Sequence, residues 1–482
     1  MTAAQVKEEG DTSSGVEGQD ENVVDWDGPD DPENPMKWSQ AKKNFHIVII
    51  GLFTLNANLA ATMFAPGAKQ LAEEFHVTDP ILAAFTVNIY VLANLVGPLF
   101  LAPFSELYGR LIVYHVCNVA YVAFTLGCAF STNVSMFLVF RVLCGLAASG
   151  PQSVGGGSIA DITSQEERGR AIALWGTGPL LGPVVGPIVG GFVTQAVGWR
   201  WTFRILLILA GAFATATVLF MRETNATVLL RRKTDRLIKE TGNTKLVPKF
   251  ATSDTPRQVF LKAIVRPSKM LVFSPIVLLL SLYTGTLYGL VFLLFTTFPA
   301  VFQETYGFGV GVSGLAYLGL GLGFMAGLLV FSLLSDRLLG QKKDGAIAAP
   351  EKRLILMKWF APITPFGCFI YGWTAQYHVH WIVPIIGTFI IGFGTLFVTI
   401  PVQTYLVDAF GAKASASALA ANLIVRSPFG ALLGLAAPPL YANLGLGWGN
   451  SVLGFITLIF TPVPWLFYRY GERLRERFAI DL

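Results

Sequence analysis

Charged residues are scarce in this sequence. Asp, Glu, Lys and Arg together make up 13% of the 482 residues, whereas hydrophobic residues make up 53%. Soluble domains carry about 25% charged residues. The composition therefore excludes an ordinary soluble protein and indicates an integral membrane protein.

Cysteine is also rare, and its positions argue against two kinds of site. The four cysteines all fall within long apolar stretches, where neither a disulfide framework nor a metal site is expected. They are Cys117, Cys128, Cys144 and Cys368. The sequence also lacks a GxxxxGKS or GxxxxGKT phosphate-binding loop and a nucleophile motif, which argues against ATP as the direct energy source and against an enzyme. We therefore expect no metal and no cofactor.

The sequence contains many long apolar runs. Twelve stretches reach roughly 20 residues, the length that crosses a bilayer as a helix. The first six lie at 45–66, 81–104, 111–130, 134–160, 171–194 and 202–221. The second six lie at 272–300, 313–334, 354–374, 382–405, 415–437 and 449–470. A polar segment separates the two sets, so the sequence predicts six plus six transmembrane helices.

The distribution of Lys and Arg predicts the orientation. Twelve basic residues lie between Arg222 and Lys269, whereas the loops on the other side of the predicted spans keep only Lys69 and Arg200. Basic residues accumulate in cytoplasmic loops, so we expect both termini to be cytoplasmic. The net charge of +5 then reflects topology rather than nucleic-acid binding. No basic segment with an apolar core opens the sequence, which predicts no cleavable signal peptide.

The same features predict the domain boundaries. Residues 1–36 hold eleven Asp or Glu and one Lys, a composition that buries too little apolar surface to fold. The stretch ETNATVLLRRKTDRLIKETGN after the sixth span fits a basic amphipathic helix on the membrane surface, or simply a linker helix. The expected units are a disordered acidic tail (1–40), a six-helix bundle (41–221), a cytoplasmic linker (222–270), a second bundle (271–470) and a short cytoplasmic tail (471–482).

An internal repeat relates the two halves. Asp161 ends the fourth span and Asp408 ends the tenth, 247 residues later, while Gly182 in the fifth span is echoed by Gly430, 248 residues later. Many transporters build a central site between two related halves. The predicted fold class is thus an all-α integral membrane protein, with twelve transmembrane helices in two pseudo-symmetric six-helix bundles.

Several motifs occur within and between the predicted spans. The turn after span two reads GPLFLAPFSELYGR, and Ser335-Asp336-Arg337 takes the corresponding place after span eight. Span four carries FRVLCGLAASG. Span five carries GTGPLLGPVVGPIVGGF, where glycines at four-residue spacing leave a groove for a neighbouring helix. Together these segments predict a kinked, closely packed bundle.

With these motifs, the chain resembles the major facilitator superfamily, specifically its twelve-helix drug/proton antiporter branch in fungi. The segments PENPMKWS and ETNATVLLRRK are similar to that subgroup as well. The resemblance implies proton coupling at Arg141, which with Gly145 matches the family's span-four motif. It implies a cytoplasmic gate of Glu106, Gly109, Arg110, Asp336 and Arg337. It implies an antiporter motif, favouring export, at Gly182, Gly186, Pro187, Gly190 and Gly191. The loop motif departs from the usual family pattern at Ala102, Glu106 and Leu107.

Two arginines lie inside predicted spans, where a charge costs about 2.5–3.5 kcal/mol at a helix centre. Arg141 either serves proton coupling or holds the bundle by hydrogen bonds to backbone carbonyls. For Arg426 we expect a gating or anchoring role ahead of substrate contact. Because no Asp or Glu lies near the middle of a span, Asp161 with Arg141 is the expected proton-carrying network, with His115 as a second choice.

Neutral polar and aromatic residues on the expected cavity helices are candidate substrate ligands. They are Asn56, Asn58, Asn88, Trp175, Tyr283, Tyr288, Gln403 and Asn422. Helix packing is the alternative role for each. As a set without formal charge, they favour a neutral or weakly charged, partly apolar substrate.

The expected function is export of amphipathic small molecules, such as drug-like toxins or a secondary metabolite, by proton antiport across the plasma membrane. The expected partners are this substrate, protons and the lipid bilayer; the chain is expected to act as a monomer and to bind no nucleic acid. A proton-coupled importer of a nutrient, polyamine or siderophore is the alternative. A receptor or sensor that binds without transporting is a more distant one.

Overall fold

The computed structural model describes residues 22–28, 31–250, 255–339 and 350–478. The helices of the first half follow the predicted apolar runs closely. They are α1 (Gln40–Thr62), α2 (Ala68–Glu74), α3 (Pro80–Tyr108), α4 (Arg110–Ala129), α5 (Val134–Ala148), α6 (Gly150–Ile162), α7 (Gln165–Val197) and α8 (Arg200–Phe220). α5 and α6 together form the fourth span.

Capping residues explain where several of these helices begin and end. Asp79, Asn133 and Ser164 accept backbone N–H bonds from the first turns of α3, α5 and α7. α3 and α7 end at Gly109 and Gly198, whose φ angles of 107° and 88° are rarely adopted by residues with a side chain. The chain can therefore reverse direction within a few residues between spans.

The second half contains one very long helical run. Its helices are α11 (Pro275–Tyr306), α12 (Val310–Ser313), α13 (Tyr317–Leu339), α14 (Ile355–Phe360), α15 (Ile363–Gln376), α16 (Ile382–Phe460) and α17 (Val463–Arg477). A straight helix as long as α16 would extend about 120 Å, four times the thickness of the hydrocarbon core. The backbone leaves helical geometry at Gly411 and Gly445, which divides α16 into three segments.

These breaks bring the number of spans to the predicted value. Among the described residues, eleven apolar helices are long enough to cross a membrane when Ala414–Arg477 is taken as one. Because Gly445 interrupts that run, it forms two spans, and the total becomes twelve. The predicted fold class is confirmed.

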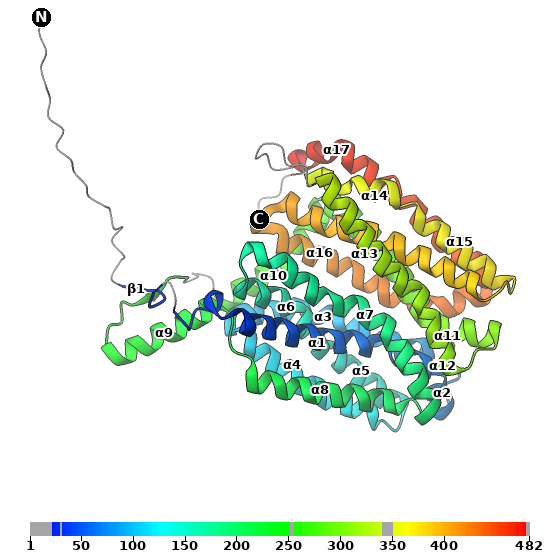
Figure 1. The fold of residues 1–482 in the computed structure, drawn as a ribbon, viewed down its shortest axis with the longest axis horizontal. Helices are drawn as coiled ribbons and strands as arrows, with labels where there is room; N and C mark the ends of the chain where they lie inside the picture. Colours follow the sequence, from blue (N-terminus) through cyan, green and yellow to red (C-terminus); the bar gives the residue numbers. More distant parts are fainter. Residues whose placement is uncertain (1–21, 29–30, 251–254, 340–349, 479–482) are drawn as a thin grey trace, which may run out of the picture.

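The two halves lie side by side and touch along part of their length. In Figure 1 the helices of the first half fill the lower part of the view and those of the second half fill the upper part. α3 packs against α16, and α7 packs against α12 and α13. We call the end of the bundle where α1 begins and α17 ends the terminal end, and the opposite end, near α2 and α12, the far end (Figure 1).

The linker between the halves is helical, and it pairs with the N-terminal segment. Its elements are α9 (Ala226–Thr241), β2 (Val247–Pro248) and α10 (Pro256–Phe273). β2 pairs in parallel with β1 (Val23–Val24). The expectation of disorder over 1–40 thus differs from the structure at residues 23–28 and 31–38, which we call the N-terminal strap. Residues 1–21 lie outside the described residues.

Charge complementarity explains why an acidic segment is ordered here. Lys233 of α9 is buried, and its Nζ lies 2.6 Å from Asp27 Oδ1 and 3.8 Å from Asp31 Oδ2. Burial opposes ionisation of Asp31, but N–H groups of Asp27 and Glu33 and the Lys233 ammonium together hold its pKa below the usual value. Acidic composition alone predicts disorder, whereas a basic helix nearby supplies the missing partner.

An aromatic anchor fixes the other end of the strap. The nearly buried Trp38 belongs to an apolar cluster at the terminal end of the first half. Its ring centroid lies 4.8 Å from that of His46, and Lys42 Nζ lies 3.7 Å from the Trp38 ring centroid. The strap therefore connects the linker helix α9 to the first bundle.

Replacing Lys233 with Met should release the strap. A hydrogen bond between charged groups contributes about 1.5–3 kcal/mol, so amide hydrogen exchange of residues 23–28 and 31–38 should become roughly tenfold faster or more. Lys239→Met, at an exposed position of the same helix, is the matched control and should leave exchange unchanged. Equal protection in the two variants would show that Lys233 does not hold the strap.

Candidate functional site

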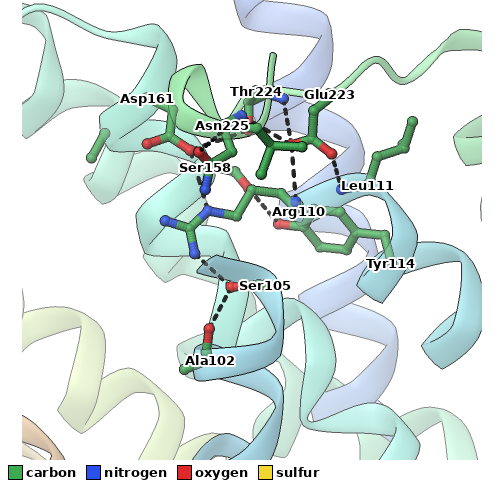
Figure 2. Close-up of polar contacts among 12 residues, drawn as sticks. Ala102, Ser105, Arg110, Leu111, Tyr114, Ser158, Asp161, Glu223, Thr224 and Asn225 are labelled. Carbon is green, nitrogen blue, oxygen red and sulfur yellow. Dashed lines mark hydrogen bonds and ion pairs between the residues drawn. The ribbon is translucent and has the colours of Figure 1, made fainter. Parts of the chain in front are cut away.

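A charged cluster at the terminal end joins several helices of the first half. Arg110, the first residue of α4, donates from Nε to Asp161 Oδ2 at 3.2 Å and from Nη1 to Ser105 Oγ at 2.5 Å (Figure 2). Asp161 also accepts a hydrogen bond from Thr224 Oγ1 at 3.3 Å. The ends of α3, α4 and α6 and the start of the linker therefore meet at one ion pair.

Glu223 completes this cluster, although sequence reasoning did not single it out. Its carboxylate accepts the backbone N–H groups of Arg110 at 2.9 Å and Leu111 at 3.1 Å, as well as those of Thr224 and Asn225 (Figure 2). The carboxylate thereby caps the positive N-terminal end of α4. The signal available in the sequence was an acid at the end of span six, within the ETNATVLLRRK segment.

Gly109 makes room for this arrangement. Its φ of 107° suits glycine, and a Cβ atom at this position would collide with Glu223 Oε2. Gly109 and Arg110 thus both belong to the cluster.

Glu106 does not join the cluster. Its side chain is exposed and forms no hydrogen bond or ion pair within the part of the chain that the structure describes. Neighbouring helical residues point about 100° apart, so Ser105 faces Arg110 while Glu106 faces away. The first-half charge network therefore rests on Arg110, Asp161 and Glu223 rather than on Glu106.

The second half has a comparable cluster made of other residues than expected. Arg353 Nε lies 2.8 Å from Asp408 Oδ2, and Arg475 Nε donates to Glu351 Oε1 at 3.0 Å. Asp408 therefore pairs with an arginine near the start of the third span of its half, as its repeat partner Asp161 does. Of the predicted gate residues in this half, Arg337 is exposed, and the side chain of Asp336 lies outside what the structure describes.

Three glycines of span five form the predicted groove, and α1 fills it. A Cβ atom at Gly182, Gly186 or Gly190 would lie too close to the backbone or side chains of α1. The nearest α1 residues are Asn58, Thr62 and Met63. This spacing brings two helix backbones of the first half into direct contact.

Gly191 and Pro187 face the second half instead. A Cβ atom at Gly191 would lie 2.8 Å from the Val310 carbonyl oxygen, and one at Gly314 would lie 2.5 Å from the Pro187 carbonyl oxygen. Gln195 Oε1 also accepts the Gly311 N–H at 2.8 Å. One helix, α7, therefore carries both the internal groove of the first half and a contact with the second half at the far end.

Arg141 lies in the interior of the first half and is 1% exposed. It donates from Nη1 to the Ala60 carbonyl at 3.0 Å, from Nη2 to that of Val87 at 3.2 Å and from Nε to that of Thr86 at 3.4 Å. Its guanidinium carbon is 4.6 Å from the Tyr90 ring centroid. These contacts match the bundle-holding alternative, because the side chain joins α1, α3 and α5.

The structure does not bring Arg141 and Asp161 together. Twenty residues of the fourth span separate them, about 30 Å along a helix. Asp161 pairs with Arg110, whereas Arg141 donates its hydrogen bonds to backbone carbonyls. The expected Arg141–Asp161 network is therefore replaced by two separate sites. His115, the second choice, is half-buried, and its Nδ1 has no hydrogen-bond partner among the described residues.

Two of the candidate substrate ligands connect helices. Asn88 accepts a hydrogen bond from Thr296 Oγ1 at 3.2 Å, which joins the two halves. Asn422 donates to Thr284 Oγ1 at 2.7 Å, which joins α16 to α11. Both amides are almost fully buried, so packing accounts for them.

Three further candidates also pack within one half. Asn58 donates to the Thr54 carbonyl at 2.8 Å, and Trp175 Nε1 donates to Thr54 Oγ1 at 3.0 Å. The Tyr283 ring stacks on Phe460 with centroids 5.4 Å apart. These interactions match the helix-packing alternative.

The remaining candidates have unused polar groups or partly open surfaces. Asn56 is fully buried, and neither atom of its amide has a hydrogen-bond partner among the described residues. Gln403 is half-buried. Tyr288 is half-buried beneath Arg426, whose guanidinium carbon lies 4.8 Å from the ring centroid.

Comparison with known proteins decides the family. The sequence pattern of the Major Facilitator Superfamily matches residues 48–435. The chain belongs to the major facilitator superfamily. Two helical bundles with clusters of charge at equivalent helix ends accord with that assignment, and the predicted resemblance is confirmed.

Close relatives are fungal transporters. The chain is 68% identical over 463 residues to the MFS transporter fsa7 of a Fusarium species, covering 96% of this chain and 91% of the relative. It is 63% identical to the trichosetin biosynthesis cluster MFS transporter of Gibberella fujikuroi, with 96% and 90% covered. The xylose transporter XylE from E. coli, in a partially occluded inward-open conformation, shares the fold with a TM-score of 0.68 at 16% identity, covering 89% of this chain and 98% of XylE. This chain is thus a membrane transporter and not an enzyme, as expected.

Replacing Gly186 with Leu should disrupt the contact between α7 and α1. A Cβ atom there would lie 2.7 Å from Thr62 Oγ1 and 3.2 Å from backbone atoms of α1. Overpacking of this kind costs roughly 1–3 kcal/mol, so thermal unfolding in detergent should occur at a lower temperature. Gly176→Leu is the matched control on the same helix, because a Cβ atom at Gly176 meets nothing within 4 Å. Equal unfolding temperatures for the two variants would contradict the proposed groove.

Replacing Arg141 with Ala should destabilise the first half as well as impair transport. The change removes hydrogen bonds from a charged group to three carbonyls of neighbouring helices, and such bonds contribute about 1.5–3 kcal/mol each. Arg141→Lys should recover only part of the loss, since one ammonium cannot reproduce the guanidinium fork. The measurement is the unfolding temperature beside transport, with Arg204→Ala as control. Wild-type stability in Arg141→Ala would mean that these bonds do not hold the bundle.

Proposed function

We propose that this transporter is a proton-driven exporter of amphipathic small molecules, in the plasma membrane, with both termini cytoplasmic. The observation that carries the proposal is the double contact of α7, whose glycines pack on α1 while Gly191 and Pro187 meet the second half at the far end. A helix with both contacts can link movement within one half to closure of the far end. In the proposed orientation the far end is extracellular.

The distribution of ion pairs supports a form that is open toward the cytoplasm. At the terminal end, Arg110 pairs with Asp161 inside the first half, and Arg353 pairs with Asp408 inside the second half. No ion pair among the described residues joins the two halves at this end. The halves contact each other at the far end instead, which is the arrangement expected when substrate enters from the cytoplasm.

Proton coupling is proposed to reside in the pair of Asp161 and Arg110. An arginine keeps its proton under all physiological conditions, so Arg141 cannot itself carry the coupled proton. Asp161 can, and its neutralisation would release the Arg110 side chain while Glu223 still holds the start of α4. Arg141 then acts as a positioning residue for α1 and α3.

The proposed substrate class rests on the relatives. One of them is named for a trichosetin biosynthesis cluster, which supports export of a secondary metabolite over uptake of a nutrient, polyamine or siderophore. Each chain contains both bundles of the fold, so we propose that it works as a monomer.

Inverted plasma-membrane vesicles from pump-deficient yeast expressing the protein provide the test. With an acidic vesicle interior, wild-type protein should accumulate amphipathic dyes and fungal metabolites, and a protonophore should abolish the accumulation. Asp161→Asn should lose the dependence on the pH gradient, because the carboxylate that binds the proton is gone. Glu106→Gln is the control and should behave like wild type, since Glu106 is exposed and unpaired among the described residues.

Two results would reject parts of this proposal. Gradient-driven loss of substrate from the same vesicles would identify an importer. An unchanged gradient dependence in Asp161→Asn would remove this residue from proton coupling.

A further inference from the structure

Arg426 is a charged residue of the bundle interior that the packing of the helices does not account for. It lies near the middle of the α16 segment bounded by Gly411 and Gly445, rather than close to the cytoplasmic end. Its Nε is buried and has no hydrogen-bond acceptor among the described residues, and no ion pair to it occurs there. A charge at this depth costs about 2.5–3.5 kcal/mol, which favours a partner.

The contrast with Arg141 is informative. Arg141 is fully enclosed, and carbonyl oxygens of α1 and α3 accept its hydrogen bonds. Arg426 is half-buried, and its guanidinium carbon lies 4.8 Å from the centroid of the Tyr288 ring. A ring face attracts a cation but accepts no strong hydrogen bond. The N–H groups along the edge of the guanidinium therefore remain available to donate hydrogen bonds to another molecule.

The surroundings place Arg426 beside the interface between the halves. Asn88 of the first half contacts Thr296 of α11 and would be struck by a Cβ atom at Gly434 of α16. From this contact, both second-half helices run eight residues, about 12 Å, toward the terminal end and reach Tyr288 and Arg426. The pair therefore lies on the terminal side of this contact, which is the side from which a cytoplasmic molecule would enter.

The stripe of α11 that carries Tyr288 is open locally rather than along its length. Residues four apart lie one above the other on a helix. On this stripe Phe292 is 8% exposed, Tyr288 is half-buried, and Thr284 and Leu280 are almost fully buried. The partly open surface of this stripe therefore includes Tyr288, where Arg426 lies over the ring.

We propose that Arg426 and Tyr288 form the binding site for an anionic oxygen group, a carboxylate or similar delocalised oxyanion, carried by the transported molecule. The planar guanidinium suits such a group because two N–H donors can reach two oxygens at once. The Tyr288 ring, with Phe292 beside it at a centroid distance of 4.8 Å, offers an apolar surface to the rest of the molecule. This assignment rests on the proposed export function, and it replaces both the anchoring role expected for Arg426 and the neutral substrate expected from the sequence.

Binding of two xanthene dyes to purified protein tests the site without relying on transport. Fluorescein carries a carboxylate, whereas rhodamine 6G has a similar ring system but is a cationic ester. Fluorescence anisotropy is measured with wild-type protein in phosphatidylcholine nanodiscs, which supply no anionic lipid headgroup to occupy the arginine. We expect wild type to bind fluorescein at least about tenfold more tightly than rhodamine 6G, as a charge-assisted hydrogen bond contributes about 1.5–3 kcal/mol.

The variants separate recognition from folding. Arg426→Gln should lose roughly tenfold or more of the fluorescein affinity and none of the rhodamine 6G affinity. Arg426→Lys should keep part of the preference, and Tyr288→Phe, which retains a ring face, should bind nearly as well as wild type. Arg469→Gln, at an exposed position of α17, is the control and should not differ from wild type.

The outcomes are distinct from those of the vesicle experiment. Absence of a fluorescein preference in wild type, or an equal loss of both dyes in Arg426→Gln and Arg426→Lys, would overturn the anion site. The second result would assign Arg426 to packing. A clear preference that depends on Arg426, together with no gradient-driven accumulation in vesicles, would keep the binding site and reject proton-driven export.

Discussion

The organisation of this transporter depends on one constraint: a charge placed in the bilayer or at a buried helix end needs a partner from the protein, since lipid supplies none. Arg141 meets it with carbonyl oxygens of two neighbouring helices. Arg110 satisfies the constraint by forming an ion pair with Asp161, and Glu223 satisfies it by accepting the N–H groups at the start of α4. Each solution joins elements distant in sequence, so satisfying the charges also sets how the first-half helices pack.

The sequence predicts features that depend on neighbouring residues better than features that depend on contacts between distant residues. Apolar runs and glycine spacing are local, and they were sufficient to predict the twelve spans and the groove that receives α1. The partner of a charge is not local. Arg141 and Asp161 share a span and suggested one network, but a helix of that length separates them by about 30 Å. Ser105 and Glu106 differ by one position, and only the orientation of α3 decides which of them meets Arg110.

The N-terminal strap illustrates the same limit at the scale of a segment. Its composition predicts disorder when it is considered alone, because few apolar side chains are available to bury. The basic face of α9 changes the outcome, since Lys233 is itself buried and needs the carboxylates of Asp27 and Asp31. The linker sequence predicted a helix on the membrane surface or a simple linker helix, and in the structure part of its positive charge is satisfied by the acidic segment that precedes the first span.

The location of these partners also affects the free-energy cost of the proposed alternating access. The pairs Arg110–Asp161 and Arg353–Asp408 of the terminal end each lie within a single half, so rotation of one half against the other separates neither of them. What must part at the far end is a set of glycine-backed contacts around α7 and neutral hydrogen bonds such as that between Thr296 and Asn88. Neutral hydrogen bonds contribute about 0.5–1.5 kcal/mol each, less than bonds to charged groups. Confining charge pairs to the interior of each half and leaving small neutral contacts between the halves therefore permits a moving interface with a stable bundle on either side.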